Sequence, residues 1–149
     1  MFIQKLVLLI GLSFLFVACS TGGFYSDHMS VREAGGPTKM GIRYLLGRGV
    51  VQNDAKAFYY FNQAAQEEDA FAQNEVAYMY AAGKGTTQDY GKALMWYEKA
   101  ANHGLASAQY NLGLMYLHGL GTAPNKVLAM QWIQKAAAHG FEPARSIRP

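Results

Sequence analysis

The chain has little cysteine and little charge, and each scarcity excludes a class of protein. Cys19 is the only cysteine among 149 residues, so no disulfide can form within the chain. Thirteen basic and ten acidic residues give a net charge of +3, too small to indicate binding to nucleic acid or, by charge, to a membrane surface. The run Glu67, Glu68 and Asp69 is more typical of a solvated turn than of a catalytic acid and base. No serine or histidine lies in a nucleophile-elbow context, so nothing in the sequence supports catalysis.

Long apolar runs are also missing, except at the N-terminus. Residues 1–18 contain one charge, at Lys5, followed by the apolar run of residues 6–17. This run is too short for a stable spanning helix. A positive start, a short apolar stretch and a small residue at the end are the marks of a secretory signal. We therefore predict a signal peptide at residues 1–18, with an N-terminal membrane anchor as the alternative.

The end of this segment, Phe16-Val17-Ala18-Cys19, resembles the bacterial lipobox, although Phe16 replaces the usual leucine, valine or isoleucine. The resemblance implies cleavage before Cys19, attachment of a diacylglyceryl group and a further acyl chain such as palmitate, and stable anchoring in a membrane. Ser20, rather than aspartate, follows the cysteine and resembles the enterobacterial-type signal for the outer membrane. Residues 19–32 are polar and predict a flexible tether. The alternative is a soluble secreted protein with an incidental cysteine.

A pattern with a period of 36 residues occurs three times in the rest of the chain. The recurring positions are Tyr44, Tyr80 and Tyr116; Ala57, Ala93 and Ala129; the aromatic residues Tyr60, Trp96 and Trp132; and the glycine pairs at 47/49, 83/85 and 119/121. A fixed period of this length indicates stacked structural repeats. Such repeats bury a one-dimensional core and leave a long face free for binding.

Each repeat is predicted to contain two helices joined by the glycine loop. In the middle unit, Ala93, Trp96 and Ala100 lie at the spacing of one helix face. Residues that can cap the start of each second helix are Asn53, Asp89 and Asn125. Gly104 and Gly140 can end the second helices in a left-handed conformation. Because Glu68 stands at the equivalent place, we expect the first of these helices to end less sharply.

These residues resemble the Sel-1-like repeat family, a relative of the tetratricopeptide repeat. The third unit carries the resemblance through Ala108, Leu112-Gly113, Tyr116, Gly119, Gly121, Trp132 and Lys135-Ala136-Ala137. The resemblance implies an all-α fold, an α/α solenoid of three 36-residue helix–loop–helix repeats. The expected domain covers residues 33–149, with units at 33–68, 69–104 and 105–140 and a short capping turn at 141–149.

Two other motifs are better explained by this repeat than by chemistry. His103 and His139 hold the same position beside the helix-ending glycines, where a cationic side chain can interact with the helix C-terminus. Packed helices would separate them by roughly 10 Å, too far to share one metal ion, so no metal site is predicted. The sequence Gly83-Lys84-Gly85-Thr86-Thr87 lacks the spacing and ending of a phosphate-binding loop. We predict no cofactor.

A second stripe runs beside the core stripe of each first helix. In tetratricopeptide-like solenoids the equivalent positions line a groove that binds peptides or partner helices, so the resemblance implies a partner-binding groove here. Its expected residues are Phe71, Asn74, Tyr78, Ser107, Tyr110, Leu114 and His118, accompanied by Ala81, Leu117, Thr38, Ile42 and Leu45. The alternative is that some of them pack between hairpins or lie under the tether.

The sequence therefore favours a non-catalytic, protein-binding lipoprotein of the bacterial cell envelope, an adaptor or scaffold anchored in the outer membrane and facing the periplasm. Its partners are expected to be proteins of the periplasm or envelope, with the membrane reached through the lipid and no role for nucleic acid. One alternative is an immunity protein that neutralises a secreted, type VI-type toxin such as a phospholipase. The others are an enzyme acting on cell-wall or lipid substrates and a structural lipoprotein of envelope assembly.

Overall fold

The computed structural model describes residues 35–147. The helical repeats form one compact unit that begins at Pro37. The predicted signal peptide at 1–18, Cys19 and the tether at 19–32 lie outside the described residues. Within residues 35–147 every regular element is a helix, and none of them is both long and apolar enough to cross a bilayer.

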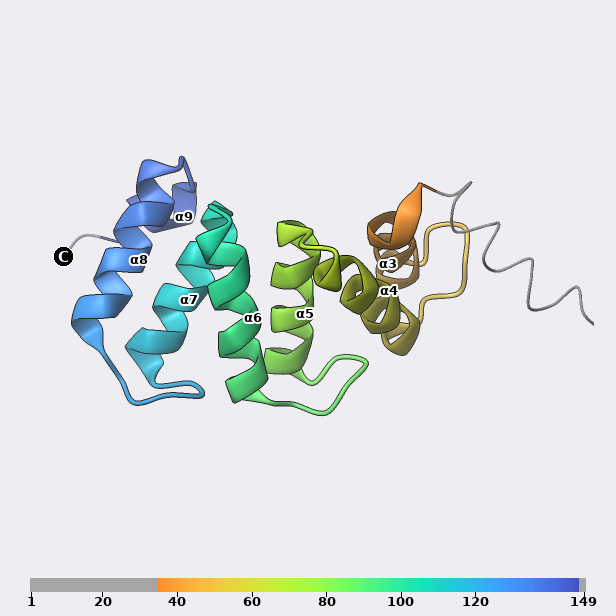
Figure 1. Cartoon of the computed structure of the whole chain (residues 1–149), viewed down its shortest axis with the longest axis horizontal. Helices are drawn as coiled ribbons and strands as arrows, with labels where there is room; N and C mark the ends of the chain where they lie inside the picture. Colours follow the sequence, from red (N-terminus) through yellow and green to blue (C-terminus); the bar gives the residue numbers. More distant parts are fainter. Residues whose placement is uncertain (1–34, 148–149) are drawn as a thin grey trace, which may run out of the picture. The chain divides into compact units, whose positions relative to one another are not determined.

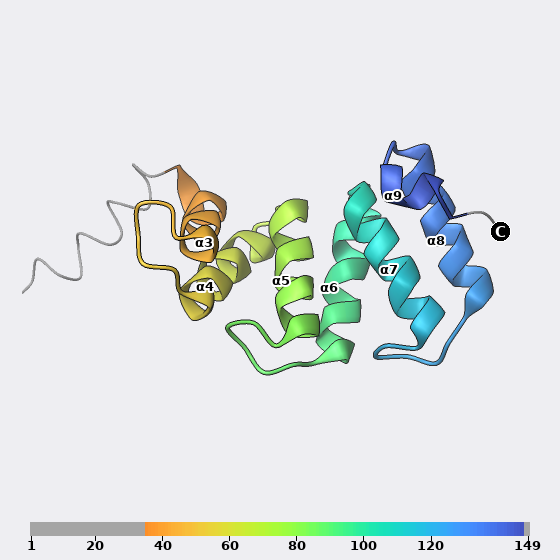
Figure 2. The same ribbon diagram turned by 180° about the vertical axis from the view of Figure 1, so that it is seen from behind.

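The helices follow one another as hairpins, each packed against the next (Figures 1 and 2). In chain order they are α3 (Gly36–Leu46), α4 (Asp54–Gln66), α5 (Ala70–Ala82), α6 (Tyr90–Asn102), α7 (Ala106–His118), α8 (Lys126–Ala138) and α9 (Glu142–Arg145). We call α3, α5 and α7 the first helices, and α4, α6 and α8 the second helices. The predicted all-α class and three-repeat solenoid are confirmed.

The predicted caps at the start of the second helices are confirmed. Asn53, Asp89 and Asn125 each accept a hydrogen bond through the side-chain oxygen from the backbone N–H three residues later, at 2.9, 2.9 and 3.0 Å. Each bond satisfies one of the N–H groups that a helix start leaves without a partner. The three second helices therefore begin at equivalent residues and have the same length of 13 residues.

The prediction that α4 ends less sharply than the other second helices is wrong. Glu68 takes a positive φ of 64°, close to the 85° of Gly104 and the 86° of Gly140. The cause is the closure of the turn, because Asp69 N–H donates to the Ala64 carbonyl at 3.2 Å, as Leu105 N–H does to Ala100. A left-handed conformation costs a non-glycine residue roughly 1 kcal/mol, which these closing bonds offset.

The acidic run has a structural role through one of its members. Asp69 caps the start of α5, where its Oδ1 accepts from the Ala72 N–H at 3.1 Å. Its Oδ2 accepts from Thr38 Oγ1 at 2.6 Å, which ties the beginning of α3 to the beginning of α5. Glu67 and Glu68 are exposed at the turn, as predicted.

At the opposite end of the hairpins, glycine loops touch the preceding repeat. A Cβ placed on Gly85 would collide with the backbone carbonyl of Asp54, and one on Gly121 with that of Tyr90. Asp54 and Tyr90 are the first residues of α4 and α6, so each loop lies directly on the second helix of the previous repeat. Glycine is required twice over, since both positions also have positive φ.

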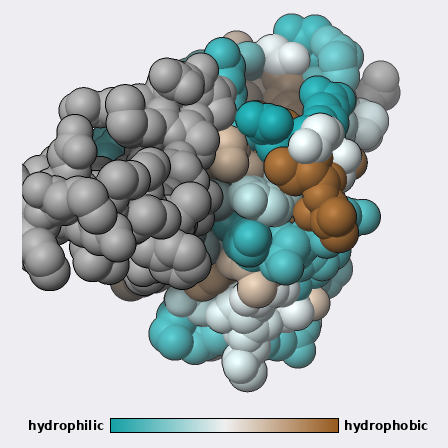
Figure 3. Space-filling view, turned by 90° about the vertical axis from the view of Figure 1, so that its right-hand side faces the viewer, coloured by the Kyte–Doolittle hydropathy of each residue, from teal (hydrophilic) through white to brown (hydrophobic). Residues whose placement is uncertain are grey.

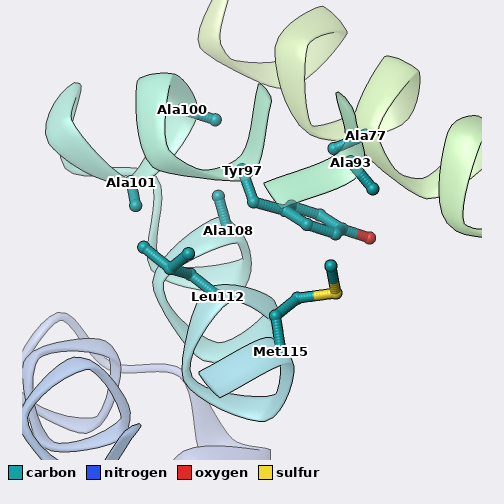
Figure 4. Close-up of a cluster of buried hydrophobic side chains, with 8 residues drawn as sticks. All are labelled: Ala77, Ala93, Tyr97, Ala100, Ala101, Ala108, Leu112 and Met115. Atoms are coloured by element: carbon teal, nitrogen blue, oxygen red, sulfur yellow. The ribbon is translucent and has the colours of Figure 1, made fainter. Parts of the chain in front are cut away.

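The core alternates small and large residues between the two helices of a hairpin. Gly113 faces Ile133 so closely that a Cβ would lie 2.6 Å from the Ile133 side chain. One repeat earlier, Ala77 and Tyr97 occupy these positions and belong to one buried cluster with Leu112 (Figure 4). In both hairpins a small residue of the first helix thus lies by a large residue of the second helix, whose side chain fills the space that the small residue leaves.

The predicted capping turn is also confirmed. The short helix α9 (Glu142–Arg145) packs against α8. Its Ala144 is buried with Ile133 and Ala136, and Phe141 contacts the same cluster. The last hairpin is therefore covered on the side where a fourth repeat would continue.

Candidate functional site

Two aromatic residues of the predicted groove are exposed on the same helix. Phe71 and Tyr78 lie on α5 and are 43% and 44% exposed. Phe71 contacts Phe61 edge-on, with ring centroids 6.2 Å apart, and Lys84 Nζ lies 6.0 Å from the centre of the Tyr78 ring. Each ring thus contacts a neighbouring side chain and is also partly exposed, which suits an aromatic anchor of an interface.

Asn74, between them on the same helix, is buried with 7% of its surface exposed. Its Oδ1 accepts from Asn111 Nδ2 at 3.2 Å, and its Nδ2 donates to Glu75 Oε1 at 3.1 Å. Asn74 therefore links α5 to α7 and offers little open surface of its own.

The groove residues of α7 are less exposed than those of α5. Tyr110 is half-buried, and its ring centroid lies 5.2 Å from that of Phe141, so the chain's own C-terminal cap covers part of it. Ser107 and Leu114 are also half-buried, whereas His118 is exposed at the end of α7.

The accompanying residues of the stripe mostly pack between elements. Thr38 bonds to Asp69, and Ile42 and Leu45 contact the buried cluster of α4 and α5. Ala81 packs on the buried cluster formed by α5, α6 and α7, and Leu117 is half-buried. The exposed aromatic residues of the predicted groove therefore lie on α5, at Phe71 and Tyr78, and its other exposed residue is His118 at the end of α7.

Sequence reasoning missed Glu75 and Asn111. Glu75 is half-buried between Phe71 and Tyr78 in the helix sequence, and its burial raises the pKa of its carboxyl, an effect that the hydrogen bond from Asn74 partly offsets. Burial also raises the pKa of the Tyr97 hydroxyl, and the nearby Glu75 carboxylate adds to that rise. The sequence offers one signal for Glu75, since it is the sole charged residue of α5.

The two histidines lie at the ends of α6 and α8, as expected from the repeat. His139 Nδ1 lies 2.9 Å from Gln109 Oε1. Within residues 35–147, no group of three or more histidine, cysteine, aspartate or glutamate side chains is placed to hold a metal ion.

The Gly83-Lys84-Gly85 segment ends a helix instead of beginning one. Gly83 is the left-handed cap of α5, and Lys84 N–H donates to the Met79 carbonyl at 2.9 Å. A phosphate-binding loop needs free N–H groups at a helix start. The segment therefore serves the repeat, as the sequence indicated.

A pocket of about 440 Å³ lies on the second helices, between the end of α4 and the end of α6. Gln73, Trp96 and Lys99 are among its lining residues, and Lys99 Nζ lies 4.4 Å from the centre of the Trp96 ring. The Oε1 atom of Gln73 is buried without a hydrogen-bond partner.

Exposed aliphatic residues also occur near the start of the described part of the chain. Seen from the end where α3 and α4 lie, the part of the surface that grey atoms leave visible is mostly hydrophilic and includes a compact hydrophobic patch (Figure 3). Leu46, at the end of α3, and Val51, in the loop before α4, are 53% and 89% exposed. They are aliphatic residues at a loop, without the paired aromatic side chains of α5.

Comparison with known proteins gives three matches to one family. The family model described as Sel1 repeat matches residues 38–69, 70–105 and 106–141. No curated protein matches the chain at a significant level.

Solved structures share both the sequence pattern and the fold. A Sel1 repeat protein from Oxalobacter formigenes is 38% identical with a TM-score of 0.70, over 80% of this chain and 94% of that one. The protein c5321, described as a protective antigen present in uropathogenic Escherichia coli strains displaying an SLR fold, is 34% identical with a TM-score of 0.69. That match covers 70% of this chain but only 22% of c5321. Cysteine rich protein B of Helicobacter pylori is 28% identical with a TM-score of 0.62, over 65% of this chain and 74% of that one.

Proposed function

Because the chain belongs to the Sel1 repeat family, we propose that it is a non-catalytic adaptor or scaffold that binds another protein through its first helices. The observation that carries the proposal is the exposure of Phe71 and Tyr78 on α5, a helix whose opposite side is buried in the core. Exposed aromatic residues at helical spacing are typical anchors of protein interfaces.

Cys19 supplies the second part of the proposal. Its lipobox-like context supports lipidation, and the acyl chains then hold the protein in the outer membrane with the repeats in the periplasm. Residues 19–32 act as the tether between lipid and repeats. The partner is accordingly a protein of the periplasm or the envelope.

Photocrosslinking in intact cells tests the binding surface. The photoreactive amino acid p-benzoylphenylalanine is placed at Phe71 or Tyr78 in the full-length protein, and at Tyr59 as a control. Tyr59 is also an exposed aromatic residue, at 58%, but it lies on the second helix α4. We expect one protein to be crosslinked from positions 71 and 78 and not from 59. Crosslinking from 59 alone, or from none of the three positions, would contradict the proposal.

The identity of the crosslinked protein distinguishes the possible roles. A secreted toxin recovered in stoichiometric amounts indicates an immunity protein, and a component of an envelope complex indicates an adaptor. In either case, replacing Phe71 and Tyr78 together by alanine is expected to weaken binding by about a hundredfold, because each buried aromatic anchor contributes about 1–2 kcal/mol.

A further inference from the structure

A continuous row of polar side chains crosses from α7 to α5 and ends at a carboxylate. Asn111 Nδ2 donates to Asn74 Oδ1 at 3.2 Å, and Asn74 Nδ2 donates to Glu75 Oε1 at 3.1 Å. Both amides are oriented with their N–H groups toward the carboxylate. Since a carboxylate that accepts a hydrogen bond is stabilised in its ionised form, the row favours the charged Glu75 carboxylate and fixes the position of its Oε1 atom.

This carboxylate has no cation of its own. The ion pairs found in residues 35–147, Lys92 with Asp89 and Arg145 with Glu142, do not include Glu75. Lys84, the cation beside Tyr78, makes a contact with that ring and no ion pair with Glu75. Half-burial of Glu75 removes part of its hydration and raises the pKa of its carboxyl. A cation brought by another molecule would replace that missing hydration.

The surroundings of Glu75 favour an organic cation over a metal ion. Phe71 and Tyr78 stand one helical turn before and after it, at spacings that place all three on one face of α5. Aromatic faces attract the ammonium group of lysine and the guanidinium group of arginine. They also cover the aliphatic part of these long side chains, which a bare ion lacks.

The same positions in the next repeat provide an internal comparison. One period later, Ser107, Asn111 and Leu114 replace Phe71, Glu75 and Tyr78. These replacements carry neither an acidic group nor an aromatic ring. The combination of a carboxylate between two exposed aromatic side chains therefore belongs to α5 and is not dictated by the packing of the repeat.

We propose that the partner presents a lysine or arginine side chain that pairs with Glu75 between Phe71 and Tyr78. The inference rests on the proposed protein-binding function and specifies the chemistry of the partner. Asn74 and Asn111 act as positioning residues, because their hydrogen bonds fix where the Glu75 carboxylate lies.

Peptide selection provides the test. Random twelve-residue peptides displayed on phage are selected against the full-length protein purified in detergent, and the binders are measured against three forms of it. These are the wild type, Glu75→Gln, and the control Glu67→Gln, which removes an exposed carboxylate in the turn after α4. Glutamine keeps the oxygen that accepts from Asn74, so the variant tests the charge and not the fold.

We expect the selected peptides to be rich in lysine or arginine and to lose at least about tenfold in affinity with Glu75→Gln but not with Glu67→Gln. A Glu75→Lys variant should select acidic peptides instead. Peptides that lack basic residues, or that bind Glu75→Gln equally well, overturn this inference while leaving the proposed binding face intact, provided that Tyr78→Ala abolishes their binding. Selection of no peptide sensitive to Tyr78→Ala overturns the binding face and this inference together.

Discussion

His139 donates a hydrogen bond from Nδ1 to Gln109 Oε1 at 2.9 Å, which joins the end of α8 to the start of α7. The direction is fixed because Gln109 Nε2 already donates to the Ala101 carbonyl at 3.1 Å, leaving Oε1 as the acceptor. One repeat earlier, Gln73 makes the equivalent bond to Ala65 at 3.2 Å, but its Oε1 is buried and without a partner. Gln73 and Gln109 therefore hold equivalent positions in the repeat but differ in the hydrogen bonding of Oε1.

This difference predicts unequal effects of two matched substitutions. His139→Ala should lower the free energy of unfolding by about 1 kcal/mol, since it leaves the buried Gln109 Oε1 without a donor. His103→Ala should have an effect of less than about 0.5 kcal/mol, because no such bond is lost. Urea unfolding of both variants measures the difference. Equal losses would show that the bond to Gln109 does not contribute.

The glycine loops predict a large effect from a single methyl group. Gly85→Ala should cost about 2–4 kcal/mol, because the Cβ collides with the Asp54 backbone and the residue has a positive φ. Gly104→Ala shares the positive φ but has no atom within 4 Å of the added Cβ, so it should cost only about 1 kcal/mol. The comparison separates steric collision from backbone strain. Similar unfolding midpoints for the two variants would refute the contact with Asp54.

Glu68 offers the opposite kind of substitution. Glu68→Gly should raise the free energy of unfolding by about 0.5–1 kcal/mol, since glycine adopts the φ of 64° without strain. Glu67→Gly should lower it, because the Glu67 φ of −87° is comfortable for any residue and glycine only adds disorder to the unfolded chain. Thermal unfolding of the two variants and the wild type measures both changes in stability. A destabilised Glu68→Gly would mean that the turn is not strained.

The raised pKa of Glu75 predicts a pH-dependent difference between wild type and Glu75→Gln. A carboxyl with a higher pKa in the folded state binds its proton more tightly there, so its contribution to stability falls as the pH rises from the usual 4.5 through the raised value. At pH 7 the glutamine variant should therefore be more stable than the wild type, and below pH 4 the difference should largely vanish. Unfolding curves at both pH values measure it. A variant that is less stable than the wild type at pH 7 would contradict the assignment.

Lipidation of Cys19 is testable by fractionation. Cys19→Ala should no longer incorporate radiolabelled palmitate and should leave the membrane fraction, because a single signal segment without acyl chains does not anchor the repeats stably. Ser20→Ala serves as the control and should remain in the membrane. Retention of Cys19→Ala in the membrane fraction would refute anchoring through this residue.

The repeat made most of the fold predictable from sequence. Asn53, Asp89 and Asn125 are caps because local backbone geometry alone decides that role, and the 36-residue spacing places each at a helix start. Glu68 was misjudged because the closing bonds of the turn, made by its neighbours, set its backbone conformation. Residue type is a weak guide where the neighbours impose the geometry.

The candidate site was predictable only in part. Phe71 and Tyr78 stand out by their position on the stripe, and both are exposed. The row from Asn111 through Asn74 to Glu75 depends on how α7 lies against α5, which periodicity does not specify. The cover on Tyr110 likewise depends on Phe141, which follows the last complete repeat.

The first and second hairpins contact each other at both ends, by the hydrogen bond of Thr38 to Asp69 at one end and by the close approach of Gly85 to Asp54 at the other. Bending of these two hairpins relative to each other is resisted, since bending in either direction must open one of the two contacts. We therefore expect a partner to fit the first helices in the shape that they already have, so that little binding free energy is used to reshape the repeats.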